Sequence, residues 1–469
     1  MSEQFSYGSE FIPSPARVFL LGIGGIGMSA LAQLLLRQGY TVAGSDRGLA
    51  EPDKQDLYSK LRCQGAVLFP QDGSGPREFR PDALVVSAAI EPGNADLAAA
   101  PALPIFHRAV ALSQTLQRLQ IAQIAVAGSC GKTTVTGWLT SALRQLSRQV
   151  LMVNGGYDLD YENQTHPGNF FSDPEPEFAV FEVDESDRSI REFSPEYALL
   201  LNIGNDHYST AELQEVFAAF LARAARAAVL PAQLADLPPP ALTRKYFSEK
   251  PAAVPSAYVQ TYQGTPEGCQ FTITGYPPIS CRQTGLHSAW NAAAVLQMLS
   301  IVLPSQSPAA LAEAMHGFTG IRQRFELMSA PGARCPYIND YAHNPEKIAA
   351  ALAAARERFG SPVLAVFQPH GFGPLGFMRQ ALAESLRESL QHGDQLLLLP
   401  VYYAGGSSSH QPTAQEVAEE YAARGLPVMY VPDRETAAAI IRNSQAQRCV
   451  LVMGARDASL RSWTGTLAC

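Results

Sequence analysis

The stretch that decides the fold is Ile124-Ala125-Val126-Ala127-Gly128-Ser129-Cys130-Gly131-Lys132-Thr133-Thr134. Small and β-branched apolar residues lead into a Gly-x-x-Gly-Lys-Thr-Thr turn, and a helical pattern begins at Val135. This order predicts a buried strand, a phosphate-binding loop and a helix whose N-terminal N–H groups face a bound anion. We expect Lys132 to reach the terminal phosphates of a nucleotide and the Thr133 hydroxyl to bind Mg²⁺.

The loop is shorter than the usual nucleotide-binding signature, because Val126 stands where that signature has its first glycine. A glycine-rich strand–helix turn that binds nothing is the alternative interpretation. The Gly-Lys-Thr-Thr run follows directly on a clean strand pattern, which favours nucleotide binding.

A second glycine-rich turn precedes this stretch. A strand over 17–21 runs into Gly22-Ile23-Gly24-Gly25-Ile26-Gly27, a helix reaches Arg37, and a strand over 40–44 closes at Asp46. The pattern predicts a β–α–β unit that holds a diphosphate, with Asp46 about 20 residues on, where a ribose-binding acid is expected. NAD, FAD, another diphosphate and tight packing without a ligand all remain open. Strands are also expected at 66–69 and 83–87, and Ser87 opens a turn at a carboxyl strand end.

Charged residues end two strands that follow the phosphate loop. Strands are expected at 151–153, 178–183 and 197–203, and their ends carry Glu182-Val183-Asp184-Glu185-Ser186-Asp187 and Gly204-Asn205-Asp206-His207. Because the carboxyl ends of parallel strands meet at one edge of a sheet, we expect Glu182 and His207 to converge on nucleotide-bound Mg²⁺. A solvated acidic turn and a structural histidine are the alternatives, and the nearby phosphate loop favours the joint site.

The remainder of the chain predicts a ribbon and a third sheet. Residues 231–282 are proline-rich at 237–240 and then alternate at 257–261 and 269–274, as a β-ribbon excursion does, before a helix resumes at His287. Strands expected at 337–339, 363–367, 395–399, 428–431 and 449–453 alternate with helices, which predicts a parallel α/β sheet. Two of its strand ends read Asn339-Asp340-Tyr341-Ala342-His343-Asn344-Pro345 and Gln368-Pro369-His370.

Composition bounds the class of protein. The chain has 469 residues, enough for two to four domains, and a formal net charge of −8, which argues against nucleic acid or an anionic membrane as a partner. Its seven cysteines include no Cys-x-x-Cys pair, which fits a reducing compartment. Residues 1–15 lack a signal-peptide pattern, and no apolar stretch reaches the length of a membrane span. We expect a loose leader over 1–15 and a cytoplasmic protein.

Three α/β modules with a diphosphate loop, a short ATP loop and an Asp-Tyr-Ala-His-Asn-Pro strand end resemble the Mur ligase family of ATP-dependent carboxylate–amine ligases. The resemblance covers the chain from Arg17 onward. It implies an α/β fold of three domains. These are a UDP-sugar-binding Rossmann-like domain over 16–118, a central P-loop ATP-binding domain with a β-ribbon excursion over 119–322, and a Rossmann-like amine-binding domain over 323–469.

The resemblance also implies roles for individual residues. The expected catalytic residues are Lys132, Glu182, His207, Asp340, His343 and His370, with Thr133, Glu182 and His207 as magnesium ligands. The expected ATP contacts are Gly128, Ser129, Cys130, Gly131, Lys132, Thr133, Thr134, Asn291, Arg324 and Asp340. The expected UDP-sugar contacts are Gly22, Ile23, Gly24, Gly25, Ile26, Gly27, Asp46, Ser87 and Arg108. Tyr341 belongs to the segment expected to close over ATP and the amine.

Several positions depart from the family pattern. Cys130 replaces a histidine in the ATP loop, and Ser288 replaces an adenine-binding asparagine. In the third domain, Gly371-Phe372-Gly373-Pro374-Leu375-Gly376 stands where the family has an arginine-rich stretch, Pro400 replaces an aspartate, and Arg456 replaces a glycine. A hydrogen bond to a charged group is worth roughly 1.5–3 kcal/mol, so the loss of two arginines without replacement should lower turnover with the usual amine by orders of magnitude. We therefore expect a rebuilt amine pocket in the third domain beside intact nucleotide and metal sites.

The leading hypothesis is a ligase that uses ATP and Mg²⁺ to join a UDP-muramoyl-type carboxylate to an amino acid or peptide amine. The substrates implied are UDP-N-acetylmuramate and L-alanine or another amine, joined through an acyl-phosphate in peptidoglycan precursor synthesis. Alternatives are murein-tripeptide recycling, a ligase-like protein with another amine or no turnover, and an oxidoreductase that binds NAD in the first module. The sequence leaves the amine and the oligomeric state open.

Overall fold

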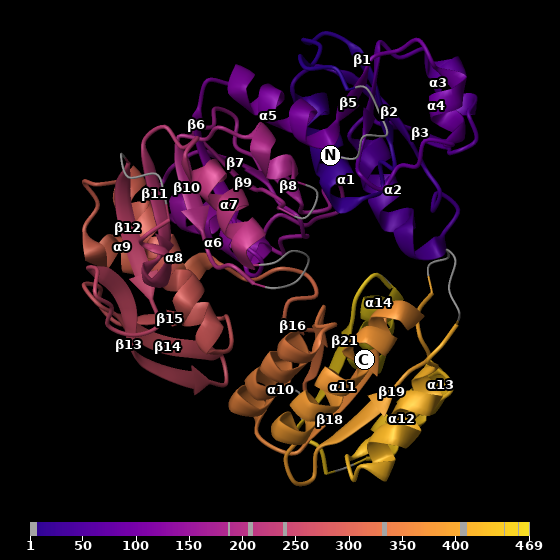
Figure 1. Cartoon of the computed structure of the whole chain (residues 1–469), viewed down its shortest axis with the longest axis vertical. Coiled ribbons are helices and arrows are strands. Elements are labelled where there is room, and N and C mark those ends of the chain that lie inside the picture. Colours follow the sequence, from indigo (N-terminus) through magenta and orange to yellow (C-terminus); the bar gives the residue numbers. More distant parts are fainter. Residues whose placement is uncertain are drawn as a thin grey trace. The chain divides into compact units, whose positions relative to one another are not determined.

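The structure is a computed structural model that describes residues 7–185, 188–204, 210–237, 242–330, 335–403, 410–444, 446–457 and 459–468. The chain divides into two compact units (Figure 1). The first comprises residues 1–262, 271–281 and 287–321, and the second comprises 263–270, 282–286 and 322–469. No helix in the described part of the chain is long and apolar enough to cross a membrane.

The first sheet has five strands in the order β3-β2-β1-β4-β5, and every neighbouring pair is parallel. Its strands are β1 (Arg17–Leu21), β2 (Thr41–Asp46), β3 (Val67–Pro70), β4 (Ala83–Val86) and β5 (Ile105–His107). Its helices are α1 (Ile26–Arg37), η1 (Pro52–Lys54), α2 (Gln55–Cys63), α3 (Ser74–Phe79), α4 (Ala95–Ala99) and α5 (Arg108–Arg118). The predicted β–α–β unit is confirmed. The strand order reverses between β1 and β4, the point where such sheets bind ligands.

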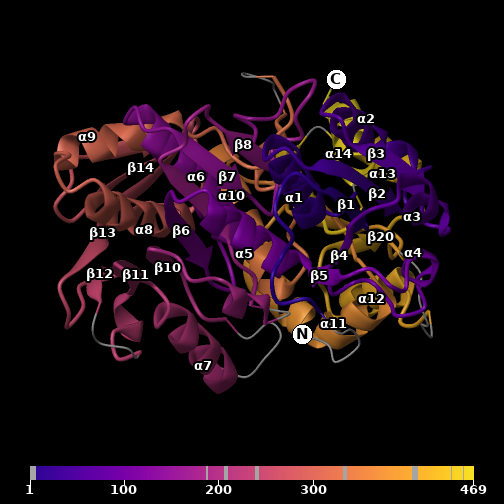
Figure 2. The ribbon, with the colours of Figure 1, turned by 90° about the horizontal axis from the view of Figure 1, so that it is seen from above.

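The second sheet has ten strands in the order β15-β14-β13-β12-β11-β10-β6-β9-β7-β8. Its strands are β6 (Ala122–Ala127), β7 (Val150–Val153), β8 (Phe170–Ser172), β9 (Phe178–Glu182), β10 (Tyr197–Leu200), β11 (Ala227–Pro231), β12 (Thr243–Ser248), β13 (Ser256–Thr265), β14 (Gly268–Ile273) and β15 (Ile279–Cys281). Its helical segments are α6 (Lys132–Gln145), η2 (Ser189–Glu192), α7 (Thr210–Leu221), η3 (Ala232–Leu234), α8 (Leu286–Val302), α9 (Pro308–Glu313) and η4 (Ala314–Gly317). Helix α6 lies against β6, β7 and β9 (Figure 2).

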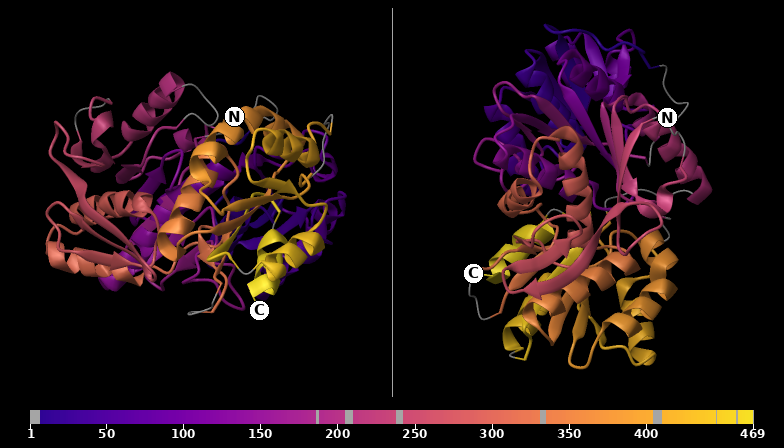
Figure 3. Two further views of the ribbon diagram at one scale, coloured as in Figure 1. Left: turned by 90° about the horizontal axis from the view of Figure 1, so that it is seen from below. Right: turned by 90° about the vertical axis from the view of Figure 1, so that its left-hand side faces the viewer.

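The expected β-ribbon is present, but it is not a separate excursion. Strands β13 and β14, the salmon arrows in the right-hand view of Figure 3, continue the central sheet through β12 and β11. Strands β11 and β12 pair in parallel with their neighbours, and the sequence analysis missed these two strands. The proline-rich run at 237–240 gave no strand signal, and residues 238–241 lie outside the described part of the chain.

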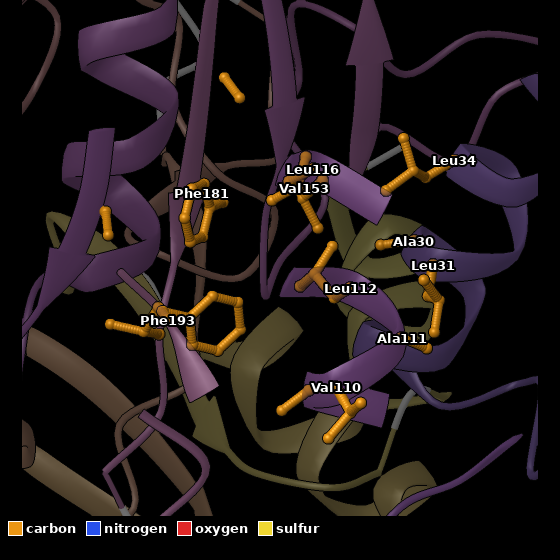
Figure 4. Packing of buried hydrophobic residues seen from close by; sticks show 14 of the residues in the cluster. Ala30, Leu31, Leu34, Val110, Ala111, Leu112, Leu116, Val153, Phe181 and Phe193 are labelled. Carbon is orange, nitrogen blue, oxygen red and sulfur yellow. The ribbon is translucent and has the colours of Figure 1, made fainter. Parts of the chain in front are cut away.

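One hydrophobic core joins the first two sheets within the first unit. Figure 4 shows side chains of α1 and α5 packed with those of β7 and β9. Leu34, Leu112, Val153 and Phe181 are all at most 5% exposed. Residues 7–15, expected to be a loose leader, also join this core, because Phe11 is fully buried and its ring contacts those of Tyr40 and Phe106.

The third sheet forms the second unit, in the order β16-β17-β21-β18-β19-β20. Its strands are β16 (Glu326–Leu327), β17 (Tyr337–Asp340), β18 (Val363–Gln368), β19 (Gln395–Leu398), β20 (Val428–Tyr430) and β21 (Cys449–Gly454). Its helices are α10 (Pro345–Phe359), α11 (Phe372–Ser389), α12 (Ala414–Ala423), α13 (Arg434–Asn443) and α14 (Ser459–Ala468). All pairs are parallel except β16 with β17. Helices α10 to α12 pack on one face and α13 and α14 on the other, which confirms the predicted Rossmann-like sheet.

Candidate active site

The phosphate loop lies between the end of β6 and the start of α6. Gly128 and Gly131 have φ angles of 132° and 88°, which L side chains rarely adopt. The side chain of Asn202, just after β10, closes the loop: its amide accepts from the Cys130 N–H and donates to the Cys130 carbonyl, each at 2.9 Å. The loop shape is therefore fixed from the neighbouring strand, by a residue that the sequence analysis missed.

Lys132 begins helix α6 and is held by the loop and by an acid. Its Nζ donates to the Gly128 carbonyl at 2.6 Å and to Glu185 Oε2 at 2.9 Å. Burial opposes the charge of Lys132, but the carboxylates led by Glu185 outweigh it and raise the lysine pKa. The side chain is 16% exposed and remains a cation at the N-terminus of α6. Glu185 was seen in the sequence only as part of an acidic run.

Thr133 and Glu182 form the candidate magnesium position. The Thr133 hydroxyl donates to Glu182 Oε2 at 2.9 Å. Two glycines pack against this pair: a Cβ atom on Gly155 would lie 1.6 Å from Glu182 Oε1, and one on Gly156 would lie 2.7 Å from the Thr133 methyl carbon. Hydroxyl and carboxylate oxygens are the donors that Mg²⁺ prefers, so the pair fits this ion. The expected third ligand, His207, lies outside the described residues.

Two asparagines of the first unit border the loop. The Oδ1 atom of Asn291, on α8, lies 3.1 Å from the position that a Cβ atom on Gly131 would take. Asn154, which follows β7, donates from its side chain to the Thr133 carbonyl at 3.1 Å. The structure thus brings Lys132, Thr133, Glu182 and Asn291 together around one helix N-terminus, the arrangement that binds phosphates elsewhere.

The glycine turn after β1 forms a second candidate site in the same unit. Both carboxylate oxygens of Asp46 accept backbone bonds at 2.8 Å, one from Gly24 and one from Gly48. The guanidinium of Arg108 covers the turn, because a Cβ atom on Gly27 would lie 2.7 Å from its Nη1. Asp46 therefore shapes the turn, and Arg108 brings a positive charge to it. Ser87 directly follows β4, at the reversal of the strand order.

In the second unit, Asp340 ends β17 and is enclosed by backbone. Its carboxylate accepts from the N–H groups of Phe325 and Ala342, each at 2.7 Å. Burial raises the pKa of Asp340, and the positive charges of Arg324 and Lys347 oppose that rise. The guanidinium of Arg324 lies 5.0 Å from the centroid of the Tyr341 ring, a cation–π contact.

Two histidines meet at the carboxyl ends of β17 and β18. The rings of His343 and His370 pack edge to face with centroids 5.0 Å apart. Burial, with the neighbouring charges of His343 and Arg456, lowers the pKa of His370 to about 4. His370 is therefore neutral at pH 7. The sequence analysis placed both residues at strand ends, and the structure brings them into contact.

An aromatic cluster includes Phe372, which belongs to the 371–376 segment that departs from the family pattern. Phe372, Tyr403 and His410 contact one another with ring centroids 4.9–5.7 Å apart. Phe372 begins α11 directly after Gly371, whose φ angle is 126°. The sequence analysis noted the missing charges here but missed the cluster, because its three members are far apart along the chain.

Three family models match this chain in order. The Mur ligase family catalytic domain matches residues 17–119, the Mur ligase middle domain matches 126–230, and the Mur ligase glutamate ligase domain matches 323–456. Together they include most of the residues described above.

Relatives match over nearly the whole length. A UDP-N-acetylmuramate–L-alanine ligase of Mycobacterium avium is 31% identical over 95% of this chain and 93% of the relative. One from Streptomyces coelicolor is 31% identical over 94% and 95%. Among solved structures, the UDP-N-acetylmuramate–alanine ligase of Thermotoga maritima is 25% identical, with a TM-score of 0.79 over 96% of this chain and 98% of that one. A murein peptide ligase of Psychrobacter arcticus, 20% identical with a TM-score of 0.66 over 97% and 98%, shares the fold. The chain belongs to the Mur ligase family, and by that membership it is an ATP-dependent, ADP-forming ligase that makes amide bonds.

Proposed function

We propose that this enzyme joins the carboxylate of UDP-N-acetylmuramate to the amine of an amino acid, L-alanine or another, in the cytoplasmic synthesis of peptidoglycan precursors. The observation that carries the proposal is the grouping of Lys132, Thr133 and Glu182 at the N-terminus of α6. The names of relatives that match over more than nine-tenths of the chain support the choice of substrates.

In the proposed first step, a carboxylate oxygen of the sugar nucleotide attacks the γ-phosphorus of ATP, ADP leaves, and an acyl-phosphate forms. The neutral amine then attacks the acyl carbon, displaces phosphate and loses a proton to give the amide. Two anions must approach in the first step, so their charge must be neutralised. The Lys132 ammonium supplies one positive charge where the phosphates meet the helix N-terminus. Magnesium, held by Thr133, Glu182 and His207, would supply the rest. We assign the remaining phosphate contacts to residues 128–134 and a contact with the nucleotide to Asn291.

We assign the UDP-sugar to the glycine turn of the first sheet. The turn at Gly22, Gly24 and Gly27 would bring the diphosphate to the N-terminus of α1, and Arg108, whose guanidinium lies against Gly27, offers it a cation. Asp46 already accepts two backbone hydrogen bonds, so we propose that it stabilises the shape of the turn in addition to contacting the UDP-sugar. Residues 23, 25 and 26 and Ser87 complete the proposed contact surface.

We assign the amine to the strand ends of the second unit, with Asp340, His343 and His370, while Arg324 and Asp340 remain predicted contacts of the nucleotide. The aromatic cluster of Phe372, Tyr403 and His410 favours a second candidate, in which the amine is larger or more apolar than L-alanine. Two other candidates are a ligase that recycles a murein tripeptide and a ligase-like protein without turnover. The amine that supports phosphate release, or the absence of release with any amine, distinguishes them.

Phosphate release from ATP, with UDP-N-acetylmuramate, Mg²⁺ and a panel of amines, tests the proposal. The panel contains L-alanine, glycine, L-serine, L-leucine, L-phenylalanine and the L-alanyl-γ-D-glutamyl-diaminopimelate tripeptide. We expect release with at least one amine, and the preferred amine separates the candidates. A protein that is stabilised by ATP but releases no phosphate with any amine would contradict the proposal. Stabilisation by NAD rather than by UDP-sugar would instead favour the oxidoreductase.

A further inference from the structure

Residues 154–169, which connect β7 to β8, form a closed loop whose two ends are hydrogen-bonded. The Asn154 N–H donates to the Asn169 carbonyl at 2.9 Å. Asn154 and Asn169 are 1% and 0% exposed. Gly168, with a φ angle of 96°, lets the chain return: a Cβ atom there would lie 2.6 Å from the Asp158 carbonyl oxygen. The loop is thus a compact element with two buried ends.

The Asn154 end contacts the phosphate loop. The Asn154 side chain donates to the Thr133 carbonyl at 3.1 Å. Gly155 and Gly156, the next two residues, pack directly on Glu182 and Thr133. This end of the loop therefore fixes the first turn of α6 and the candidate magnesium ligands.

The Asn169 end contacts the glycine turn of the other sheet. Its side-chain NH₂ donates to the Ile26 carbonyl at 2.8 Å and to Ser29 Oγ at 2.9 Å, while its Oδ1 accepts from Gln33 Nε2 at 2.9 Å. All of these partners belong to α1, and Ile26 lies within the candidate UDP-sugar loop. The middle of the loop adds contacts to α2 and the residue after it: Lys60 pairs with Glu162 at 3.3 Å, and Gln64 donates to the Thr165 carbonyl at 2.8 Å.

We propose that the 154–169 loop sets the spacing between the two nucleotide-binding loops and that Asn169 is the positioning residue that fixes it. Only three hydrogen bonds, through Asn154 and Asn169, separate the Thr133 carbonyl from the Ile26 carbonyl. The hydrophobic attraction in the core between the sheets is non-directional, whereas a hydrogen bond requires a narrow range of distance and angle. This inference rests on the proposed function, because only a reaction between the two ligands requires their spacing to be exact.

The consequence is kinetic. The reacting carboxylate and γ-phosphate must approach to about 3–3.5 Å, and a misplacement of about 1 Å can lower the rate about 100-fold. Each ligand still meets its own intact loop when the spacing changes. Loss of the Asn169 hydrogen bonds should therefore lower kcat, while the KM of each nucleotide changes little.

The test compares Asn169→Ala with Thr165→Ala in the phosphate-release assay. Thr165 belongs to the same loop, and its exposed side chain bonds to Asn163 and His166, which lie in that loop. The Thr165→Ala variant keeps the backbone carbonyl that accepts from Gln64. We expect Asn169→Ala to lower kcat at least 10-fold, with the KM values for ATP and UDP-N-acetylmuramate within about threefold of wild type. Thr165→Ala should retain the wild-type kcat.

A second variant guards against a folding defect. Ser29→Ala removes one of the three partners of the Asn169 side chain and leaves the other two. We expect a smaller fall in kcat with the same unchanged KM values. The inference is overturned if kcat of Asn169→Ala and Ser29→Ala equals that of Thr165→Ala, or if their loss lies in KM. If the wild-type chain releases no phosphate with any amine, the proposed function fails and this inference fails with it.

Discussion

The Thr133 hydroxyl donates to the Glu182 carboxylate at 2.9 Å and so joins the first turn of α6 to the end of β9. The two residues are 49 positions apart in the chain. Helix α6 supplies the Thr133 hydroxyl and strand β9 supplies the Glu182 carboxylate, so two candidate metal-binding groups lie at the carboxyl edge of the central sheet. A divalent cation at this point would lie beside the Lys132 ammonium, where the phosphates of a nucleotide need positive charge.

Replacing Glu182 tests this position. Glu182→Gln keeps the shape of the side chain and an acceptor for Thr133 but removes the negative charge that a hard cation requires. We expect kcat to fall about 100-fold or more and the Mg²⁺ concentration for half-maximal phosphate release to rise. The matched control is Glu177→Gln, just before the same strand, where the half-exposed carboxylate pairs with Arg148. An unchanged Mg²⁺ dependence in Glu182→Gln would remove Glu182 from the metal site.

A methyl group on Gly155 tests the same position by geometry. Its Cβ atom would lie 1.6 Å from Glu182 Oε1, so the carboxylate must leave Thr133. We expect Gly155→Ala to remain folded, to keep UDP-sugar binding, and to lose at least 10-fold in kcat at low Mg²⁺. Gly93→Ala is the control, because in the described part of the chain no atom beyond its two sequence neighbours lies within 4 Å of the added methyl. Equal activity of the two variants in a Mg²⁺ titration would contradict the expectation.

The features predicted correctly from the sequence are those that depend on a few neighbouring residues. The glycine turns after β1 and β6 were predicted, because glycine, a preceding apolar strand and a following helix are signals a few residues long. Placement at the carboxyl edge of a sheet was also predictable for Glu182, Asp340, His343 and His370, since each lies at the end of a strand pattern or just after it. The position of Glu182 beside Thr133 followed from that edge rule.

Contacts between distant positions were not predictable in the same way. Asn202, Asn154 and Asn169 hold the two loops through side-chain amides, and an isolated asparagine gives no pattern that distinguishes it from a turn residue. Strands β11 and β12 were missed because their neighbours in the sheet, and not their own alternation, define them. The carboxylate of Asp46 was expected to face a ribose, but its bonds to Gly24 and Gly48 depend on the folded turn.

Removing the ammonium of Lys132 should separate ligand binding from stability. In Lys132→Met we expect ATP to lose its thermal stabilisation, and we expect the unliganded protein to lose about 1–3 kcal/mol because Glu185, 8% exposed, is left unpaired. The double variant Lys132→Met/Glu185→Gln should regain most of that stability without regaining ATP binding. Lys250→Met, at an exposed position, is the control. ATP stabilisation of Lys132→Met equal to that of wild type would contradict the assignment.

Asp158 predicts an unusual pH dependence of stability. It is fully buried beside Gly137, and burial, with the nearby charge of Asp160, raises its pKa to about 8, although the Asp160 N–H bonds to it. An aspartate in the unfolded chain has a pKa of about 3.9, so the folded state holds its proton more tightly. The contribution of Asp158 to stability is therefore complete below about pH 4 and is lost as the pH rises to about 8, the reverse of a salt-bridged aspartate.

Asp158→Asn removes this titration and keeps an acceptor for the Asp160 N–H. The free energy of unfolding of the variant relative to wild type should rise by about 1 kcal/mol per pH unit between pH 5 and pH 8, and level off above pH 8. Denaturant unfolding at four pH values measures this difference, with the exposed Asp236→Asn as the matched variant, for which we expect no such trend. A difference that is flat from pH 5 to pH 8 would mean that Asp158 is ionised in the fold. An ionised carboxylate buried at this position would need a cationic partner. The structure instead places Asp158 Oδ2 beside Gly137, where the next nearest atoms belong to the apolar side chains of Ile321 and Phe318.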